Sequence, residues 1–85
     1  MARVLIVDDS PSQLLVLRRI VESLGHEAVT AEDGQQGVEM ARQHLPDLIL
    51  MDVVMPNLNG FQATRTISRD KTTSHIPVIL VTTKD

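Results

Sequence analysis

The 85-residue sequence contains no cysteine, tryptophan or tyrosine, and its single aromatic residue is Phe61. The lack of cysteine excludes disulfide frameworks, thiol catalysis and zinc sites built on cysteine. With one aromatic ring, the core must be aliphatic, and a surface that stacks nucleic-acid bases on aromatic side chains is not expected. The disulfide-rich and thiol-dependent classes of protein are therefore excluded, and a base-stacking protein is not expected.

Charge and hydrophobicity set further limits. The net charge is −3 and there is no basic block, which argues against binding to nucleic acid. No apolar run approaches the roughly 20 residues that span a bilayer, and no signal-peptide cleavage pattern follows Met1. Hydrophobic residues make up 42% of the chain and charged residues 22%, as in globular domains. We therefore expect one cytoplasmic domain that binds neither nucleic acid nor a membrane.

Short apolar runs alternate with amphipathic stretches along the chain. Continuous runs of about four apolar residues predict strands that are covered on both faces, as in parallel sheets. A more mixed segment predicts an edge strand. The predicted strands are Val4–Val7, Leu48–Met51 and Val78–Val81, with Glu27–Ala31 as the weaker edge candidate.

Three stretches between the strands predict helices. The first begins with Ser10 as its cap and Pro11 at its first position, with Gln13 placed to close a capping box, and it ends at Gly25. Its predicted inner face comprises Leu14, Leu17, Val21 and Leu24, widened by Leu15 and Ile20. The second helix runs from about 34 to 44 with Val38 and Ala41 inward, and the third from about 60 to 69 with Phe61, Ala63, Thr64 and Ile67 inward.

Oxygen-bearing side chains follow the long apolar strands. Asp8 and Asp9 come after the first run, Asp52 after the third predicted strand, and Thr82 and Thr83 after the fourth. Alternating strands and helices imply a parallel sheet, whose carboxyl edge is where ligands bind. Clustered carboxylates repel one another and attract a hard cation such as Mg²⁺, and a carboxylate beside that ion can act as a nucleophile toward phosphorus.

A structural interpretation competes at each of these positions. An aspartate after a strand is often only a helix cap or a turn residue, and a threonine pair at a strand end is usually structural. The metal or phosphate site is favoured because several strands place oxygen ligands at the same edge. Gly34 and Gly37 do not form a phosphate-cradling loop, since neither glycine-rich nucleotide-binding motif is present.

Three segments of the sequence resemble response-regulator receiver domains. They are VLIVDDS at 4–10, LMDVVMPNLNG at 50–60 and IPVILVTT at 76–83, in the family's order and at its spacing. The resemblance implies an α/β fold of the flavodoxin-like (CheY-like) type, a doubly wound parallel sheet with the second strand at one edge, followed by the first, third and fourth. The chain most resembles single-domain CheY-like regulators of twitching motility and chemosensory systems.

The resemblance also implies roles for individual residues. Asp52 resembles the phosphoacceptor, and Asp8 and Asp9 resemble the acidic pair that holds Mg²⁺ together with Asp52 and the backbone carbonyl of Val54. Thr82 resembles the switch hydroxyl that turns toward the phosphoryl group, and the backbone N–H of Thr83 is placed to contact the same group. Pro56 and Gly60 would shape the loop that follows Asp52. No cofactor other than Mg²⁺ is implied.

The family has a fifth strand with a lysine that pairs with the phosphoryl group, and the 85 residues contain no counterpart. We therefore expect residues 1–85 to form a receiver domain that is incomplete at its C-terminus, truncated to four strands and three helices. The family's output face is missing with that strand. The exposed edge of the fourth strand, Val78–Val81, then predicts a homo-oligomer formed through that edge or through the uncovered face.

These features lead to three functional hypotheses. The first is a two-component signalling domain that takes phosphate on Asp52 from a CheA-like sensor histidine kinase and switches binding to an unidentified target. It is not expected to be an enzyme with an external substrate. The second is a Mg²⁺-dependent phosphatase of the haloacid-dehalogenase type, disfavoured because Asp8 and Asp9 are adjacent rather than two apart. The third is a signalling-inactive scaffold that self-associates.

Overall fold

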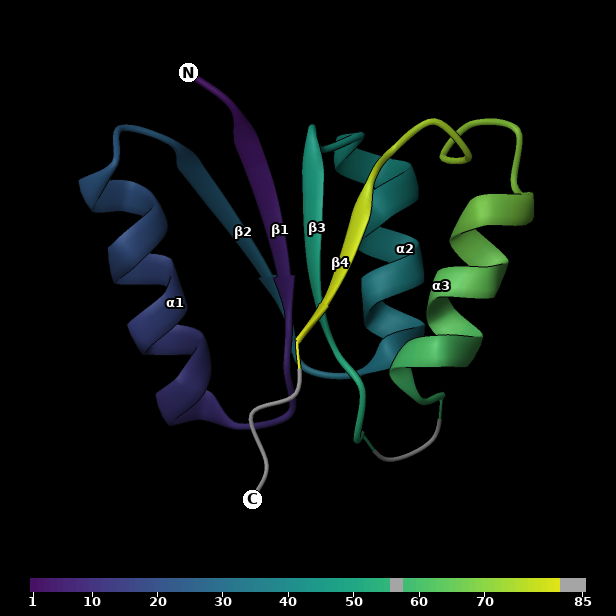
Figure 1. Cartoon of the computed structure of the whole chain (residues 1–85), viewed down its shortest axis with the longest axis horizontal. Coiled ribbons are helices and arrows are strands. Elements are labelled where there is room, and N and C mark those ends of the chain that lie inside the picture. Colours follow the sequence, from purple (N-terminus) through teal and green to yellow (C-terminus); the bar gives the residue numbers. More distant parts are fainter. Residues whose placement is uncertain (56–57, 82–85) are drawn as a thin grey trace.

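A computed structural model describes residues 1–55 and 58–81. Pro56, Thr82 and Thr83 lie outside the described residues, so the roles expected for them have no structural counterpart here. The elements are β1 (Arg3–Val7), α1 (Pro11–Ser23), β2 (Glu27–Ala31), α2 (Gly34–His44), β3 (Leu48–Asp52), α3 (Gly60–Arg69) and β4 (Val78–Val81), as Figure 1 shows. Every predicted strand and helix is present. None of the helices in the described ranges is long and apolar enough to cross a bilayer.

The described strands form one parallel sheet in the order β2-β1-β3-β4. Helix α1 lies on one face of this sheet, and α2 and α3 lie on the other (Figure 1). In the central pairs, Val7 is in register with Ala31 on β2 and with Met51 on β3. Parallel strands in this register end together, so the residues after β1 and β3 meet at the lower edge of the sheet in Figure 1.

Two hydrophobic clusters hold the layers together, one on each face of the sheet. Alternate residues of β3 enter different clusters because side chains of a strand point to opposite faces. Ile49 and Met51 pack toward α2 and α3, whereas Leu48 and Leu50 pack toward α1. The larger cluster lies under α2 and α3, and this is the side from which the loop after β3 is supported.

Each helix begins at a residue whose side chain accepts a backbone hydrogen bond. Ser10 Oγ accepts from the amide of Gln13 at 3.4 Å, and Asn59 and Gln62 form a reciprocal capping box at the start of α3. The capping box expected between Ser10 and Gln13 is wrong. The amide of Ser10 donates instead to Oδ1 of Asp8 at 2.9 Å, because Asp8, the first residue after β1, lies two residues earlier in the turn.

Two of the predicted helix faces are wrong in part. Phe61 was expected inside, but it is 57% exposed. Gly60, Ala63 and Ile67 form the inward face of α3, and Phe61 lies about 100° further round the helix. On α1, Leu14 and Val21 are buried as predicted and Leu17 packs against their cluster, whereas four other apolar side chains in the helix or at its C-cap are largely exposed. These exposed side chains are Leu15, Val16, Ile20 and Leu24.

Candidate functional site

Three carboxylates meet at the carboxyl edge of the sheet. Asp8 and Asp9 follow β1, and Asp52 is the last residue of β3. Each offers one oxygen atom, and these atoms lie within 4.8 Å of one another. The parallel register of β1 and β3 produces this meeting, because the pair Val7–Met51 places Asp8 and Asp52 at the same level, where the two neighbouring strands end. Residues 44 positions apart in sequence thus form one acidic cluster.

The three carboxylates differ in their exposure. The side chains of Asp8 and Asp52 are buried, with residue exposures of 1% and 2%, whereas Asp9 is exposed. Burying carboxylates close together is costly unless hydrogen bonds or a cation offset their charge. The amide of Ser10 donates to Asp8 Oδ1, and the amide of Asp8 itself donates to the carbonyl of Ala31 at 3.1 Å. Asp8 is therefore held by neighbouring backbone, while Asp9 faces solvent.

The donor set fits a hard divalent cation. All three side chains offer carboxylate oxygens, the ligands that Mg²⁺ prefers, and the exposed position of Asp9 leaves the cluster open to water. Mg²⁺ commonly uses one or two carboxylates and keeps several waters, so an open, partly buried acidic cluster suits it better than a closed cage. The residues present therefore fit Mg²⁺.

The loop after Asp52 is held close to the strand that precedes it. The amide of Gly60 donates to the carbonyl of Val53 at 3.0 Å, and the amide of Val53 donates to the carbonyl of Val81 at 3.3 Å. A Cβ on Gly60 would overlap the carbonyl oxygen of Asp52 and lie 2.9 Å from the Val53 Cα. Only glycine allows this close approach between the start of α3 and the end of β3. Val54 lies in this loop with its side chain exposed.

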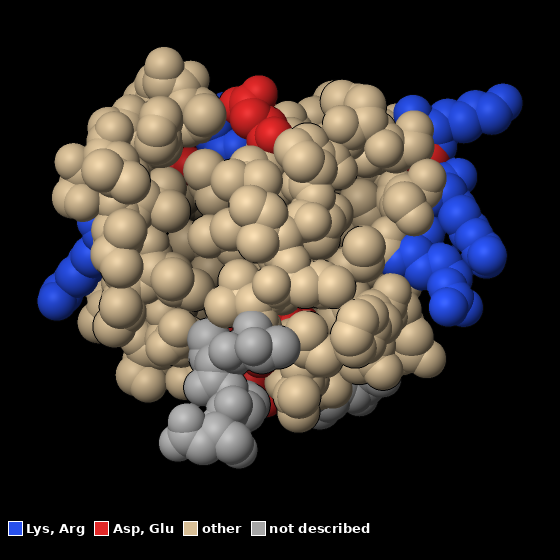
Figure 2. All heavy atoms as spheres, viewed as in Figure 1, with Lys and Arg blue, Asp and Glu red and all other residues tan. Residues whose placement is uncertain are grey.

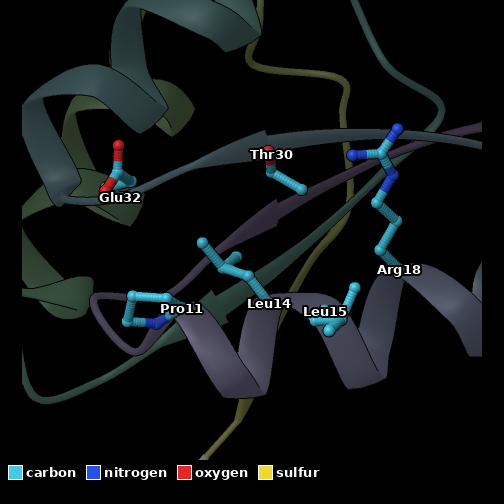
Figure 3. A pocket seen from close by; sticks show the side chains of 6 residues that line it. All are labelled: Pro11, Leu14, Leu15, Arg18, Thr30 and Glu32. Carbon is cyan, nitrogen blue, oxygen red and sulfur yellow. The ribbon is translucent and has the colours of Figure 1, made fainter.

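A hollow of about 270 Å³ lies between α1 and β2. Its walls are shown in Figure 3 and consist of Pro11, Leu14, Leu15, Arg18, Thr30 and Glu32. None of the three clustered carboxylates lines it. The chemistry expected from the sequence therefore belongs to the strand-end cluster and not to this hollow.

Sequence reasoning identified the three carboxylates but missed two contacts around them. The first is the hydrogen bond from Ser10 to Asp8, for which the Asp-x-Ser spacing is the local signal, since aspartate commonly accepts from an amide two residues on. The second is the approach of Gly34 to Leu58, which joins α2 to the loop after β3. No local pattern in the sequence indicates that contact, because the two residues belong to different elements.

Comparisons with known proteins agree with this architecture. Residues 4–85 match the family described as the response regulator receiver domain. Protein PilH of Pseudomonas aeruginosa is 59% identical over 85 residues, which span all of this chain and 70% of PilH.

The structure is also similar to solved structures of a chemotaxis protein and of a receiver domain. The chemotaxis protein CheY4 of Vibrio cholerae superposes with a TM-score of 0.92 at 32% identity, covering 100% of this chain and 71% of that one. The receiver domain of a sensor histidine kinase of Pseudomonas aeruginosa PAO1 superposes with a TM-score of 0.91 at 34% identity, covering 95% of this chain and 66% of that one. In that structure a magnesium ion is coordinated in the active-site cleft.

Proposed function

Because this chain belongs to the response regulator receiver domain family of two-component signalling, we propose that Asp52 is its phosphoacceptor and that Asp8 and Asp9 hold Mg²⁺ beside it. The single observation that carries this proposal is the meeting of the three carboxylates within 4.8 Å at the carboxyl edge of the sheet. The proposal rests on the position of Asp52 as well, at the end of a central strand with its backbone held by the start of α3.

In the proposed reaction, a carboxylate oxygen of Asp52 attacks the phosphorus atom of a phosphohistidine on a sensor kinase. The new O–P bond forms as the P–N bond breaks. The electron pair of the P–N bond leaves with the imidazole nitrogen, which then takes up a proton from water. The product is an aspartyl phosphate, a mixed anhydride. Asp52 suits this role because it is the last residue of a central strand and its carboxylate lies beside those of Asp8 and Asp9.

The metal would be held by Asp8, Asp9 and Asp52, together with the backbone carbonyl of Val54 in the loop after β3. When bound, Mg²⁺ supplies positive charge to the oxygens of the transferring phosphoryl group. Other residues of the chain hold these ligands in position. Ser10 fixes Asp8 through its amide, and Gly60 holds the loop of Val54 against β3. We also propose Thr82 as the switch hydroxyl and the Thr83 amide as a phosphate contact, by resemblance alone.

The wider setting is proposed from the relatives. The kinase would be CheA-like, the signal would concern motility or chemosensory control, and the partner whose binding changes would be a further protein. The similarity to PilH and to a chemotaxis protein supports this setting. Such a domain is covalently modified and does not turn over an external substrate, in contrast to the phosphatase hypothesis. A cytoplasmic location follows from this proposed role.

The direct test of this function is intact-mass spectrometry after incubation with Mg²⁺ and a small phosphodonor such as acetyl phosphate. We expect a phosphoryl mass increment in the wild-type chain that disappears without Mg²⁺ and in Asp52→Asn. Circular dichroism on each sample shows whether the chain is folded. A folded chain that gains no phosphoryl group would contradict the proposal, and rapid turnover of a phosphomonoester would favour the phosphatase.

A second candidate function is that of a self-associating scaffold without phosphotransfer. In the described part of the chain β4 is an edge strand, and its residues Ile79 and Leu80 are 51% and 38% exposed on opposite faces of the sheet. This strand lies toward the viewer in Figure 1, and the middle of the same face in Figure 2 is formed by uncharged residues. An apolar edge of this kind pairs readily with another copy of the chain.

A further inference from the structure

Gly34, the first residue of α2, touches the loop that connects β3 to α3. A Cβ at Gly34 would overlap the carbonyl oxygen of Leu58 and would lie 2.8 Å from the carbonyl carbon and 3.0 Å from the Leu58 Cβ. The overlapped atoms include backbone, which cannot swing aside as the end of a long side chain can. The first turn of α2 therefore abuts the loop backbone at a distance that only a glycine allows.

The conformation of the chain does not by itself explain a glycine here. Among the described residues, the glycine with a positive φ is Gly25, and Gly34 lies in regular helix after its cap, Asp33. Glycine in a helix is less stable than alanine by about 1 kcal/mol in intrinsic propensity. The close approach to Leu58 is the physical reason that remains for a glycine at this place.

The contact between Gly34 and Leu58 lies in the loop that follows Asp52 and includes Val54. This loop ends at Gly60, whose amide donates a hydrogen bond of 3.0 Å to the carbonyl of Val53. Met55 is buried in the larger cluster and Leu58 packs against it. The two ends of the loop are thus joined by the hydrogen bond between Gly60 and Val53, Met55 and Leu58 pack against the core, and Gly34 adds a contact from α2.

We propose that Gly34 is a positioning residue for the acidic site: its lack of a side chain lets α2 hold the β3–α3 loop where the loop's backbone completes the Mg²⁺ site. The inference rests on the proposed function and deepens it, because it assigns a role to a residue outside the strand ends. A Cβ at this position forces the Leu58 carbonyl away from α2 and moves the loop that carries Val54. Misplacement of a site by about 1 Å can lower a rate by about 100-fold.

The neighbouring glycine of the same helix provides a comparison. The three atoms nearest to a Cβ at Gly37 all belong to the side chain of Val7, its two methyl groups at 3.0 Å and its Cβ at 3.6 Å, and none belongs to the loop. Such a contact is relieved by a small shift of side chains in the core. Gln35, between the two glycines, is exposed and supplies a second comparison in which only helix propensity changes.

The test uses the full 85-residue chain as wild type, Gly34→Ala, Gly37→Ala and Gln35→Ala. For each, the Kd for Mg²⁺ is measured from amide NMR shifts, the phosphorylation rate with acetyl phosphate from intact mass, and the folded fraction from circular dichroism. We expect Gly34→Ala to bind Mg²⁺ more weakly and to react about 10- to 100-fold more slowly per folded molecule. Gly37→Ala changes stability without changing the Kd, and Gln35→Ala behaves as wild type.

The outcomes separate this inference from the function on which it rests. If the folded wild-type chain neither binds Mg²⁺ nor reacts, the proposed function fails and the inference fails with it. If wild type binds and reacts and Gly34→Ala matches it per folded molecule, the inference alone is overturned. Should Gly34→Ala not fold, the wild-type titration decides: the amides of Gly34 and Leu58 must shift with the same Kd as that of Asp52. An Asp52 shift without them overturns the inference.

Discussion

The amide of Ser10, which caps helix α1, donates a hydrogen bond of 2.9 Å to a carboxylate oxygen of Asp8. This bond joins the start of a helix to a buried member of the acidic cluster, so Asp8 serves both the fold and the site. An asparagine can keep the oxygen that accepts from Ser10 while it removes the charge. The two roles of Asp8 can therefore be separated by substitution.

We predict that Asp8→Asn weakens Mg²⁺ binding by about tenfold or more, since even an outer-shell partner of a metal is worth about 10- to 100-fold. Without Mg²⁺, the same variant should be more stable than wild type in urea, because repulsion among the three carboxylates is relieved. Asp8→Ala should also lose Mg²⁺ binding, and it leaves the Ser10 amide without its acceptor, at a cost of about 1 kcal/mol. Unchanged Mg²⁺ affinity in Asp8→Asn would show that Asp8 is not part of a metal site.

Gly60, like Gly34, occupies a position where an added Cβ would overlap a backbone carbonyl oxygen. A Cβ there would overlap the carbonyl oxygen of Asp52, so we predict that Gly60→Ala lowers the free energy of unfolding by about 3 kcal/mol or prevents folding. The matched control is Gly25→Ala, where φ is +86° and no atom lies within 4 Å of the added Cβ, so the cost is backbone strain of about 1 kcal/mol. Equal costs for the two variants in urea unfolding would contradict this account of Gly60.

Asp70, the C-cap of α3, forms an ion pair with Arg42 of α2. We expect this residue to make the free energy of unfolding depend on pH. Hydrogen bonds from the amide and hydroxyl of Thr72, and then the Arg42 guanidinium at 2.6 Å, lower the pKa of Asp70 from 3.8 to about 2. Because the folded-state pKa is lower than the unfolded one, the ionised carboxylate stabilises the fold above pH 3.8. This contribution is lost as the pH falls toward 2, where the unfolded chain binds the proton first.

The corresponding measurement is urea unfolding between neutral pH and pH 2 for wild type and Asp70→Asn. The wild-type free energy of unfolding should fall more steeply over the acid part of this range than that of Asp70→Asn. Glu39→Gln, which changes an exposed carboxylate on α2, should keep the wild-type slope. The same acid slope in wild type and in Asp70→Asn would show that these hydrogen bonds do not couple protonation to folding.

The exposed edge strand predicts association at high concentration. The pairing of β3 with β4 places Ile79 on the α1 side of the sheet and Leu80 on the α2 side, so both faces of the edge are apolar. We expect the chain to form dimers or larger species by sedimentation, and Ile79→Lys to shift it toward monomer because an edge lysine opposes strand pairing. Gln43→Lys, which adds the same charge on α2, should leave association unchanged. A wild-type chain that stays monomeric across the concentration range would contradict the prediction.

Much of the fold could be predicted because short apolar runs, which indicate strands, alternate clearly with amphipathic stretches, which indicate helices. Four apolar residues between turn signals, as in Leu48–Met51, fit a strand covered on both faces, and Ser10–Pro11 marks a helix start. The inner faces were harder to predict. Phe61 is apolar and follows a helix start, but the contact of Gly60 with β3 sets the rotation of α3 and leaves the ring in solvent. The order of the strands came from the family resemblance and was confirmed.

The carboxylates of the site could be predicted because they lie at the ends of strands. Asp8, Asp9 and Asp52 follow apolar runs, and a parallel sheet brings such positions together. The contact of Gly34 with Leu58 could not be predicted, because the distance between two elements depends on how their layers pack and not on any local pattern. The assignment of a nucleophile among three carboxylates also goes beyond packing and calls for a chemical measurement.

That measurement is the location of the phosphoryl group itself. After reaction with acetyl phosphate and Mg²⁺, sodium borohydride reduces an aspartyl phosphate to homoserine, which peptide mapping by mass spectrometry assigns to one position. We predict homoserine at position 52 in wild type, with aspartate retained at positions 8 and 9, and no homoserine in samples without Mg²⁺. Homoserine at position 8 or 9, or phosphate found only on a serine or threonine, would contradict this prediction.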